Sequence, residues 1–148
     1  MLIGVSPILS PELISILNMM GHGDELVLSD AFFPGYSFND NVIRADGIKV
    51  PQLLDGILRL INLDTYVDSP VIMMAPVPGD ELDMSVEKSY REVIDARWPD
   101  TPATERIGRF EFYERAKNAF AVVITGETVK YGNIIIKKGV VPVALEFK

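Results

Sequence analysis

Short apolar runs that suit β-strands alternate along this chain with segments that carry the apolar periodicity of helices. The strand-like runs occupy residues 25–31, 41–47, 70–79, 119–127 and 133–140, and the helix-like patterns occupy residues 11–20, 49–62, 80–98 and 110–119. Such alternation favours a mainly parallel sheet covered by helices. Because 148 residues with 48% hydrophobic side chains can bury one real core, we predict a single α/β domain over residues 1–148.

The last two strand-like runs, "AFAVVITGE" and "NIIIKKGV", are rich in Val and Ile and are separated by the polar segment "TVKYG". We expect them to form a β-hairpin or an adjacent pair of strands. Residues 31–41 and 97–108 lack clear periodicity, so we predict loops there, and loops of such length often carry function.

The composition excludes several classes of protein. A formal net charge of −7 would repel phosphate backbones and anionic membranes, so nucleic acid is not an expected partner. The chain has no cysteine, which excludes disulfides, thiolate nucleophiles and thiolate zinc sites. The first 21 residues lack the basic start of a signal peptide and are too short an apolar run to span a bilayer, so we expect a cytoplasmic protein with no membrane segment.

The stretch "MMGHGDELVLSD" places the only histidine, His22, between the end of a predicted helix and the start of a strand. We expect Gly21 to end that helix in a left-handed conformation. An imidazole titrates near pH ~6.5, so His22 suits proton transfer, but a polar residue of a surface turn fits the same pattern.

Asp30 follows the strand, where ligands of open α/β sheets collect, although an aspartate there often only caps a turn. A straight strand would hold His22 and Asp30 about 20 Å apart, at about 3.3 Å per residue. They share a site only if the His22 loop folds back or if another subunit supplies one of them.

The segment "KYGN" offers Tyr131, Gly132 and Asn133, which suit either a turn or the binding of a small polyol by hydroxyl and amide groups. Arg109 begins a predicted helix, where the dipole disfavours a cation, and this points to another partner for its guanidinium.

The familiar motifs of other enzymes are missing. No segment has the spacing of a dinucleotide or P-loop fingerprint, of a nucleophile elbow, or of a zinc helix or calcium loop. We therefore expect no metal, although a metal-assisted hydrolase that uses His22, Asp24 and Asp30 stays open as an alternative.

Four segments carry a collinear resemblance that extends over nearly the whole chain: "SPELISILNMMGHGDELVLSDAFFP", "IRADGIKVPQLLDGIL", "RFEFYERAKNAFAVVITGET" and "YGNIIIKKGV". With "MGHGDE", "RFEFYERA" and "YGN" in combination, the sequence resembles the fucose branch of the fucose mutarotase and D-ribose pyranase family. The resemblance implies a three-layer α/β/α domain with a mixed, mainly parallel sheet. It also implies cyclic homo-oligomers, decameric rings in bacterial members, with sugar sites near the subunit interfaces.

The resemblance implies an isomerase that interconverts the α- and β-anomers of L-fucose by acid–base opening and closing of the ring, without a cofactor. By the same resemblance, His22 is the proton donor. The sugar-binding positions that it implies are Asp30, Arg109, Tyr131, Gly132 and Asn133.

Two features depart from the family pattern, and two other functions stay open. Phe32 stands where some fucose-type members have a polar residue, and residues 140–148 run slightly past the familiar ending. Conversion of D-ribose between pyranose and furanose forms is the alternative within enzymes. A non-catalytic sugar-binding ring protein is the alternative outside them.

Overall fold

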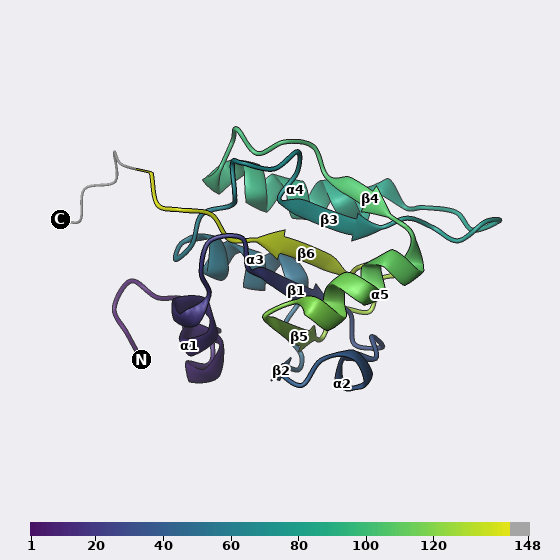
Figure 1. Ribbon diagram of the computed structural model, residues 1–148. Helices are drawn as coiled ribbons and strands as arrows, with labels where there is room; N and C mark the ends of the chain where they lie inside the picture. The colour runs from purple at the N-terminus through teal and green to yellow at the C-terminus, as the bar shows by residue number, and fades with distance from the viewer. Residues whose placement is uncertain (143–148) are drawn as a thin grey trace.

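The computed structural model describes residues 1–142 and contains a mixed six-stranded sheet with helices on both faces (Figure 1). The strands are β1 (Glu25–Ser29), β2 (Val42–Ala45), β3 (Val71–Met74), β4 (Glu105–Ile107), β5 (Ala121–Thr125) and β6 (Ile134–Lys137). The helices are α1 (Pro11–Met19), α2 (Gly35–Phe38), α3 (Val50–Leu58), α4 (Met84–Arg97) and α5 (Arg109–Asn118). The strand order is β2-β5-β1-β6-β3-β4, and β6 runs antiparallel to both neighbours while the other pairings are parallel. The predicted α/β fold with a mixed, mainly parallel sheet is confirmed.

Two apolar cores lie on the two faces of the sheet, because successive side chains of a strand point in opposite directions. Leu26 and Leu28 of β1 join the core under α1, α3 and α4, whereas Val27 joins the core under α2 and α5. In Figure 1, α5 crosses in front of the sheet, and α3 and α4 lie behind it. Within residues 1–142, no helix is both long enough and apolar enough to span a bilayer.

Helix α1 begins as its sequence predicts and ends differently. The Ser10 side chain accepts the backbone N–H of Leu13 at 3.1 Å, and Pro11 occupies the first turn. The helix ends because Met20 adopts an extended conformation with its side chain in the core. The expectation of a left-handed Gly21 is therefore wrong, and the positive φ of 86° belongs to Gly23. His22 thus lies in a turn between an extended residue and a left-handed glycine.

The prediction that the last two strands form a β-hairpin or an adjacent pair is also wrong, because β1 lies between β5 and β6. Leu28 pairs with Val123 of β5 on one side and with Ile134 of β6 on the other. All of these strands are buried, and a continuous apolar run shows that a strand is central without showing which strand is its neighbour.

The two predicted loops each contain a short element. Helix α2 lies within residues 31–41, and β4 pairs with the end of β3 from within residues 97–108. Elements of three or four residues are too short to give a periodic signal. The predicted strand over residues 70–79 ends at Met74, before Pro76 and Pro78, because proline cannot donate to a ladder.

Candidate functional site

The antiparallel direction of β6 brings its first residues to the edge of the sheet where the parallel strands end. Asp30 directly follows β1, and Asn133 directly precedes β6. The Oδ1 atom of Asn133 accepts the backbone N–H of Asp30 at 2.7 Å. Asn133 is only 5% exposed, so its amide is fixed by the strands around it. Sequence segments that are about 100 residues apart therefore meet at one polar edge.

The Asp30 side chain lies half-buried at this edge and accepts the backbone N–H of Phe32 at 2.9 Å. This bond is the turn-capping role that the sequence allowed for Asp30. Burial raises the pKa of the Asp30 carboxyl, and the negative charge of Glu127 acts in the same direction. A carboxyl with a raised pKa can exchange its proton closer to neutral pH, which suits general acid–base catalysis.

Tyr131 and Gly132 are held tightly beside this edge. Tyr131 has a positive φ of 57°, a strained conformation for a non-glycine residue, and its hydroxyl donates to Oδ2 of Asp80 at 2.6 Å. The carbonyl of Gly132 accepts the hydroxyl of buried Tyr90 at 2.8 Å. A Cβ atom on Gly132 would lie 2.8 Å from Cγ2 of Val129, so the close packing here requires glycine.

Glu127 is a buried carboxylate at the same edge that the sequence analysis missed. It follows β5 and is 5% exposed, and its Oε1 lies 3.6 Å from Nζ of Lys49. Its backbone carbonyl accepts the N–H of Ala31, which links it to the turn after β1. Its position after a strand-like run is the signal that singled out Asp30, and the same signal would have found Glu127. The partner residues Asp80 and Tyr90 carried no comparable signal.

Arg109 lies at this same edge of the sheet, but further along it than Asp30, Tyr131 and Asn133. It is the first residue of α5, which follows β4, and the strand order places β6 and β3 between β1 and β4. The guanidinium lies over the ring of Phe110, 4.9 Å from its centroid.

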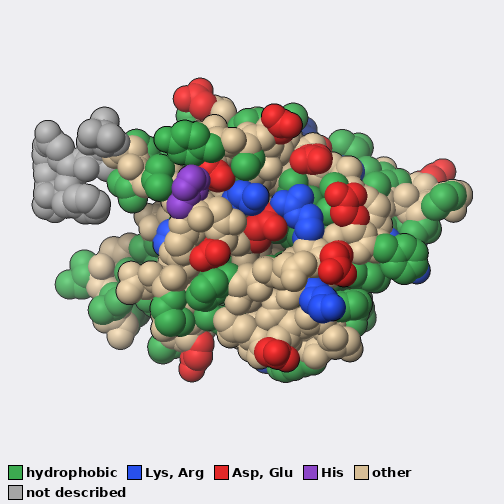
Figure 2. Space-filling model, in the orientation of Figure 1, with side chains coloured by type: hydrophobic (Ala, Val, Ile, Leu, Met, Phe, Trp, Pro, Cys, Tyr) green, Lys and Arg blue, Asp and Glu red, His purple; other side chains and the backbone are tan. Residues whose placement is uncertain are grey.

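His22 lies at the opposite edge, before β1 begins. Its Nε2 is 3.1 Å from Oδ1 of Asp64, and its ring centroid is 5.4 Å from that of Tyr66. The histidine side chain is 43% exposed, whereas that of Asp64 is 4% exposed. Figure 2 shows the imidazole at the surface of the molecule. Asp64 was missed by the sequence analysis because only the fold brings it to His22.

The electrostatics of this pair favour an ionised Asp64. Burial alone would raise the pKa of Asp64, but the backbone N–H of Tyr66 and the neighbouring His22 outweigh it, so the pKa is lowered. An ionised carboxylate only accepts hydrogen bonds, so it fixes a proton on Nε2 of His22. The exposed imidazole is thereby oriented, as a proton-transfer group must be.

One chain therefore brings together Asp30, Tyr131, Gly132 and Asn133, holds Arg109 further along the same edge, and places His22 at the other end of β1. The alternative of a metal-assisted hydrolase needs His22 and Asp30 side by side, and a single chain separates them. Within residues 1–142, no three His, Asp or Glu side chains cluster as metal ligands do.

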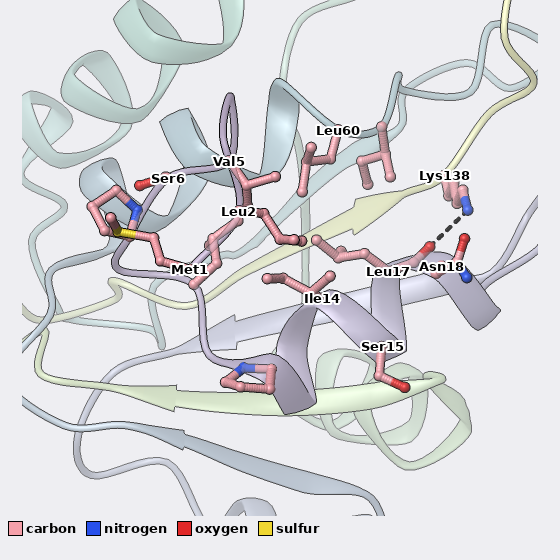
Figure 3. Close-up of a pocket in the computed structure, with 14 residues that line it drawn as sticks. Met1, Leu2, Val5, Ser6, Ile14, Ser15, Leu17, Asn18, Leu60 and Lys138 are labelled. Carbon is pink, nitrogen blue, oxygen red and sulfur yellow. Dashed lines mark hydrogen bonds between the residues drawn. The ribbon is translucent and has the colours of Figure 1, made fainter.

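Two cavities lie apart from the Asp30 edge. One of about 750 Å³ lies between the N-terminal segment and α1, and its lining is largely apolar (Figure 3). Lys138 also lines it, and its Nζ donates to the carbonyls of Leu17 and Met20. A second cavity, of about 330 Å³, reaches Asp64 and Trp98. None of the sugar-binding residues that the sequence indicates lines either cavity.

Fold and site together define a class: a single α/β sheet whose polar edge carries carboxyl, amide and phenol groups suited to a small polyol. Residues 3–141 match the model of the RbsD / FucU transport protein family. The chain belongs to this family, as its resemblance to the fucose mutarotase and D-ribose pyranase proteins predicted.

Named relatives and solved structures agree with this assignment. The chain is 60% identical over 143 residues to a protein named L-fucose mutarotase from Actinobacillus pleuropneumoniae serotype 5b, covering 97% of this chain and 99% of the relative. It is 54% identical to an L-fucose mutarotase of Haemophilus influenzae, with the same coverage. The fucose mutarotase of Streptococcus pneumoniae, solved in complex with L-fucose, superposes with a TM-score of 0.90 at 45% identity, covering 95% of this chain and 100% of that one.

The ribose branch is similar in fold only. Bacillus subtilis RbsD, solved with D-ribose, superposes with a TM-score of 0.67 at 22% identity, covering 90% of this chain and 95% of that one.

Proposed function

We propose that this protein is a carbohydrate isomerase that interconverts the α- and β-anomers of L-fucose. The observation that carries the proposal is the 60% identity, over 97% of the chain, to a protein named L-fucose mutarotase. The structure solved with L-fucose, which shares 45% of its sequence with this chain, supports the same sugar. D-ribose is the less favoured substrate, because the ribose-bound relative shares only 22%.

The reaction needs only acid–base groups. Mutarotation opens the cyclic hemiacetal, lets the C1–C2 bond rotate, and closes the ring on the other face of the aldehyde. One group takes the proton of the anomeric hydroxyl while another protonates the ring oxygen as the C–O bond breaks. Each well-placed group contributes about 10²–10⁴-fold.

In this proposal His22 is the proton donor, oriented by the buried carboxylate of Asp64 at 3.1 Å. Asp30, with its raised pKa, and Tyr131 are the candidates for the partner that takes the proton. Asp30, Arg109, Tyr131, Gly132 and Asn133 bind the sugar. Their polar groups gather at one edge of the sheet, and the Asn133 amide fixes the position of Asp30.

The separation of His22 from Asp30 by the length of β1 supports a site that two subunits complete. We propose a homo-oligomer, a decameric ring, in which the His22 edge of one subunit faces the Asp30 edge of another. Sedimentation or native mass spectrometry of the purified protein tests the subunit number. The cytoplasmic location stays a prediction from the sequence, and cell fractionation tests it.

Exchange NMR tests the function directly. L-fucose and D-ribose are measured side by side, each with and without protein, and saturation transfer between the anomeric protons gives the exchange rates. We expect the protein to accelerate α/β exchange of L-fucose more than the pyranose–furanose exchange of D-ribose. Saturable binding of L-fucose without a change in its exchange rate would overturn the proposal in favour of a sugar-binding protein.

A further inference from the structure

The loop that follows β3 contains a tight turn whose two ends hold one phenol group. The carbonyl of Val77 accepts the backbone N–H of Asp80 at 3.0 Å, and Gly79 has a φ of 86°. With Pro78 as the second residue and a left-handed glycine as the third, residues 77–80 have the pattern of a type II turn. The turn is therefore specified by its own sequence, "VPGD".

Both ends of this turn contact the hydroxyl of Tyr131. The hydroxyl donates to Oδ2 of Asp80 at 2.6 Å, and it accepts the backbone N–H of Val77 at 3.0 Å. The other oxygen of Asp80 accepts Nζ of Lys130 at 2.6 Å, so the carboxylate is held ionised and in place. Tyr131 keeps its positive φ of 57° within this set of contacts.

The direction of these two hydrogen bonds determines whether the Tyr131 hydroxyl can act as a donor or as an acceptor toward a ligand. A phenol has a single O–H donor, and here Asp80 receives it. The oxygen keeps a lone pair beyond the one that the Val77 N–H uses. While the turn is in place, the Tyr131 oxygen can face a sugar hydroxyl only as a hydrogen-bond acceptor.

We propose that Asp80 is a positioning residue of the sugar site: its carboxylate accepts the hydrogen bond of the Tyr131 hydroxyl, which leaves the phenol oxygen as a hydrogen-bond acceptor for a hydroxyl of the sugar. The proposal rests on the proposed function, in which Tyr131 binds the sugar. It assigns Tyr131 to binding, as a hydrogen-bond acceptor for a sugar hydroxyl, and leaves Asp30 as the candidate that takes the proton, opposite to the proton donor His22. Asp80 acts only through the phenol, so its effect disappears when the phenol hydroxyl is removed.

A double-mutant cycle tests this directly. The rate of L-fucose exchange is measured over a range of sugar concentrations for the wild type, Asp80→Ala, Tyr131→Phe and the double variant. We expect each single variant to lower kcat/KM about tenfold, as for a lost hydrogen bond to a charged group, and the double variant to be no worse than Tyr131→Phe. Asp80→Asn should restore part of the activity, because its amide oxygen still accepts the hydroxyl.

A matched control is Asp55→Asn. Asp55 is also a carboxylate paired with basic side chains, Arg59 and Arg97, and lies on α3 in another layer of the fold. We expect Asp55→Asn to leave the exchange rate unchanged. If Asp80 only anchors the loop, Asp80→Ala will lower the rate in the Tyr131→Phe background as much as in the wild type, which overturns the proposal.

An NMR measurement on protein whose tyrosines carry ¹³C at Cζ tests the role of Asp80 separately from the proposed mutarotase activity. The Tyr131 signal, assigned by its loss in Tyr131→Phe, should shift in Asp80→Ala and not in Asp55→Asn. If the wild type does not accelerate L-fucose exchange, the proposed function fails, and this signal still decides whether Asp80 accepts the hydrogen bond of the Tyr131 hydroxyl. An unshifted Tyr131 signal in Asp80→Ala overturns the inference even if the protein is an active mutarotase.

Discussion

Asn133 Oδ1 accepts the backbone N–H of Asp30 at 2.7 Å, so one buried amide joins the end of β1 to the beginning of β6. The bond exists because β6 runs antiparallel to β1. A parallel strand in this place would carry its first residues to the His22 edge. The antiparallel direction of β6 thus brings Asn133 to the edge of the sheet at which Asp30 lies.

The first prediction concerns His22, which is 43% exposed and packs into neither apolar core. His22→Ala should therefore still fold, with a loss of about 1 kcal/mol in the free energy of unfolding for the hydrogen bond that Asp64 loses. Its L-fucose exchange should fall toward the uncatalysed rate by about 10²-fold or more. Exchange NMR measures the rate, and circular dichroism during urea unfolding measures the stability. Exchange at the wild-type rate would remove His22 from the catalytic role.

The second prediction concerns Asp64, whose carboxylate accepts from Tyr66 and His22 with almost no access to water. Asp64→Ala leaves the backbone N–H of Tyr66 without its partner, and we expect it to lower the free energy of unfolding by about 1–3 kcal/mol at neutral pH. Urea unfolding measures this cost. L-fucose exchange should also slow, because His22 loses the group that orients it.

The pH dependence of Asp64 follows from its lowered pKa. A carboxyl whose pKa is lower in the folded state stabilises the fold above its ordinary pKa of about 3.9, and this contribution is lost as the pH falls through the folded value. The stability difference between the wild type and Asp64→Asn should therefore narrow as the pH falls below about 4. A difference that keeps growing as the pH falls below about 4 would contradict the lowered pKa.

Most of the fold could be predicted from the sequence, because the elements carry strong local signals. Ser10 and Pro11 fix the start of α1, and the alternation of patterns fixes the α/β class. The order of strands could not be predicted, because β1, β5 and β6 are all buried runs of aliphatic residues that match several neighbours equally well.

The residues of the site that carry a local sequence signal could be predicted, and those that depend on tertiary contacts could not. Asp30 and "KYGN" stand out by their position after or before a strand-like run. Asp64 and Asp80 lie in loops without a distinctive pattern, and only tertiary contacts at 3.1 Å and 2.6 Å give them His22 and Tyr131 as partners.

The third prediction concerns Tyr90, whose hydroxyl donates to the carbonyl of Gly132 at 2.8 Å. Burial raises the pKa of Tyr90, and the charges of Glu127 and Asp30 add to the shift. The unfolded chain ionises this phenol near pH 10 and the folded chain does not, so the wild type loses stability as the pH rises through about 10. Because phenylalanine does not ionise, the stability of Tyr90→Phe should not show this loss as the pH rises through about 10.

Tyr90→Phe also leaves the Gly132 carbonyl without its donor inside the protein. We expect a loss of about 1–3 kcal/mol in the free energy of unfolding at neutral pH, measured by urea unfolding. Equal stability of the two proteins at pH 7 would show that water replaces the hydroxyl at no cost.

The fourth prediction concerns Gly132, where a side chain has no room. A Cβ atom there would lie 2.8 Å from Cγ2 of Val129, 3.0 Å from the Val129 carbonyl and 3.1 Å from the Tyr90 hydroxyl. Gly132→Ala must therefore move the backbone of residues 129–133, and overpacking of this kind costs about 1–3 kcal/mol. Because Asn133 is the next residue, the shift also disturbs its bond to Asp30, and L-fucose exchange should fall.

Gly108→Ala is the matched control, because a Cβ atom at Gly108 meets nothing within 4 Å. It lies at the N-cap of α5, where glycine is preferred to alanine, so we expect a loss of about 0.5–1 kcal/mol in the free energy of unfolding. Urea unfolding and exchange NMR compare the two alanine variants under the same conditions. If Gly132→Ala is as stable and as active as Gly108→Ala, the loop before β6 tolerates displacement, and the sugar site does not depend on the close packing of Tyr90 and Val129 against Gly132.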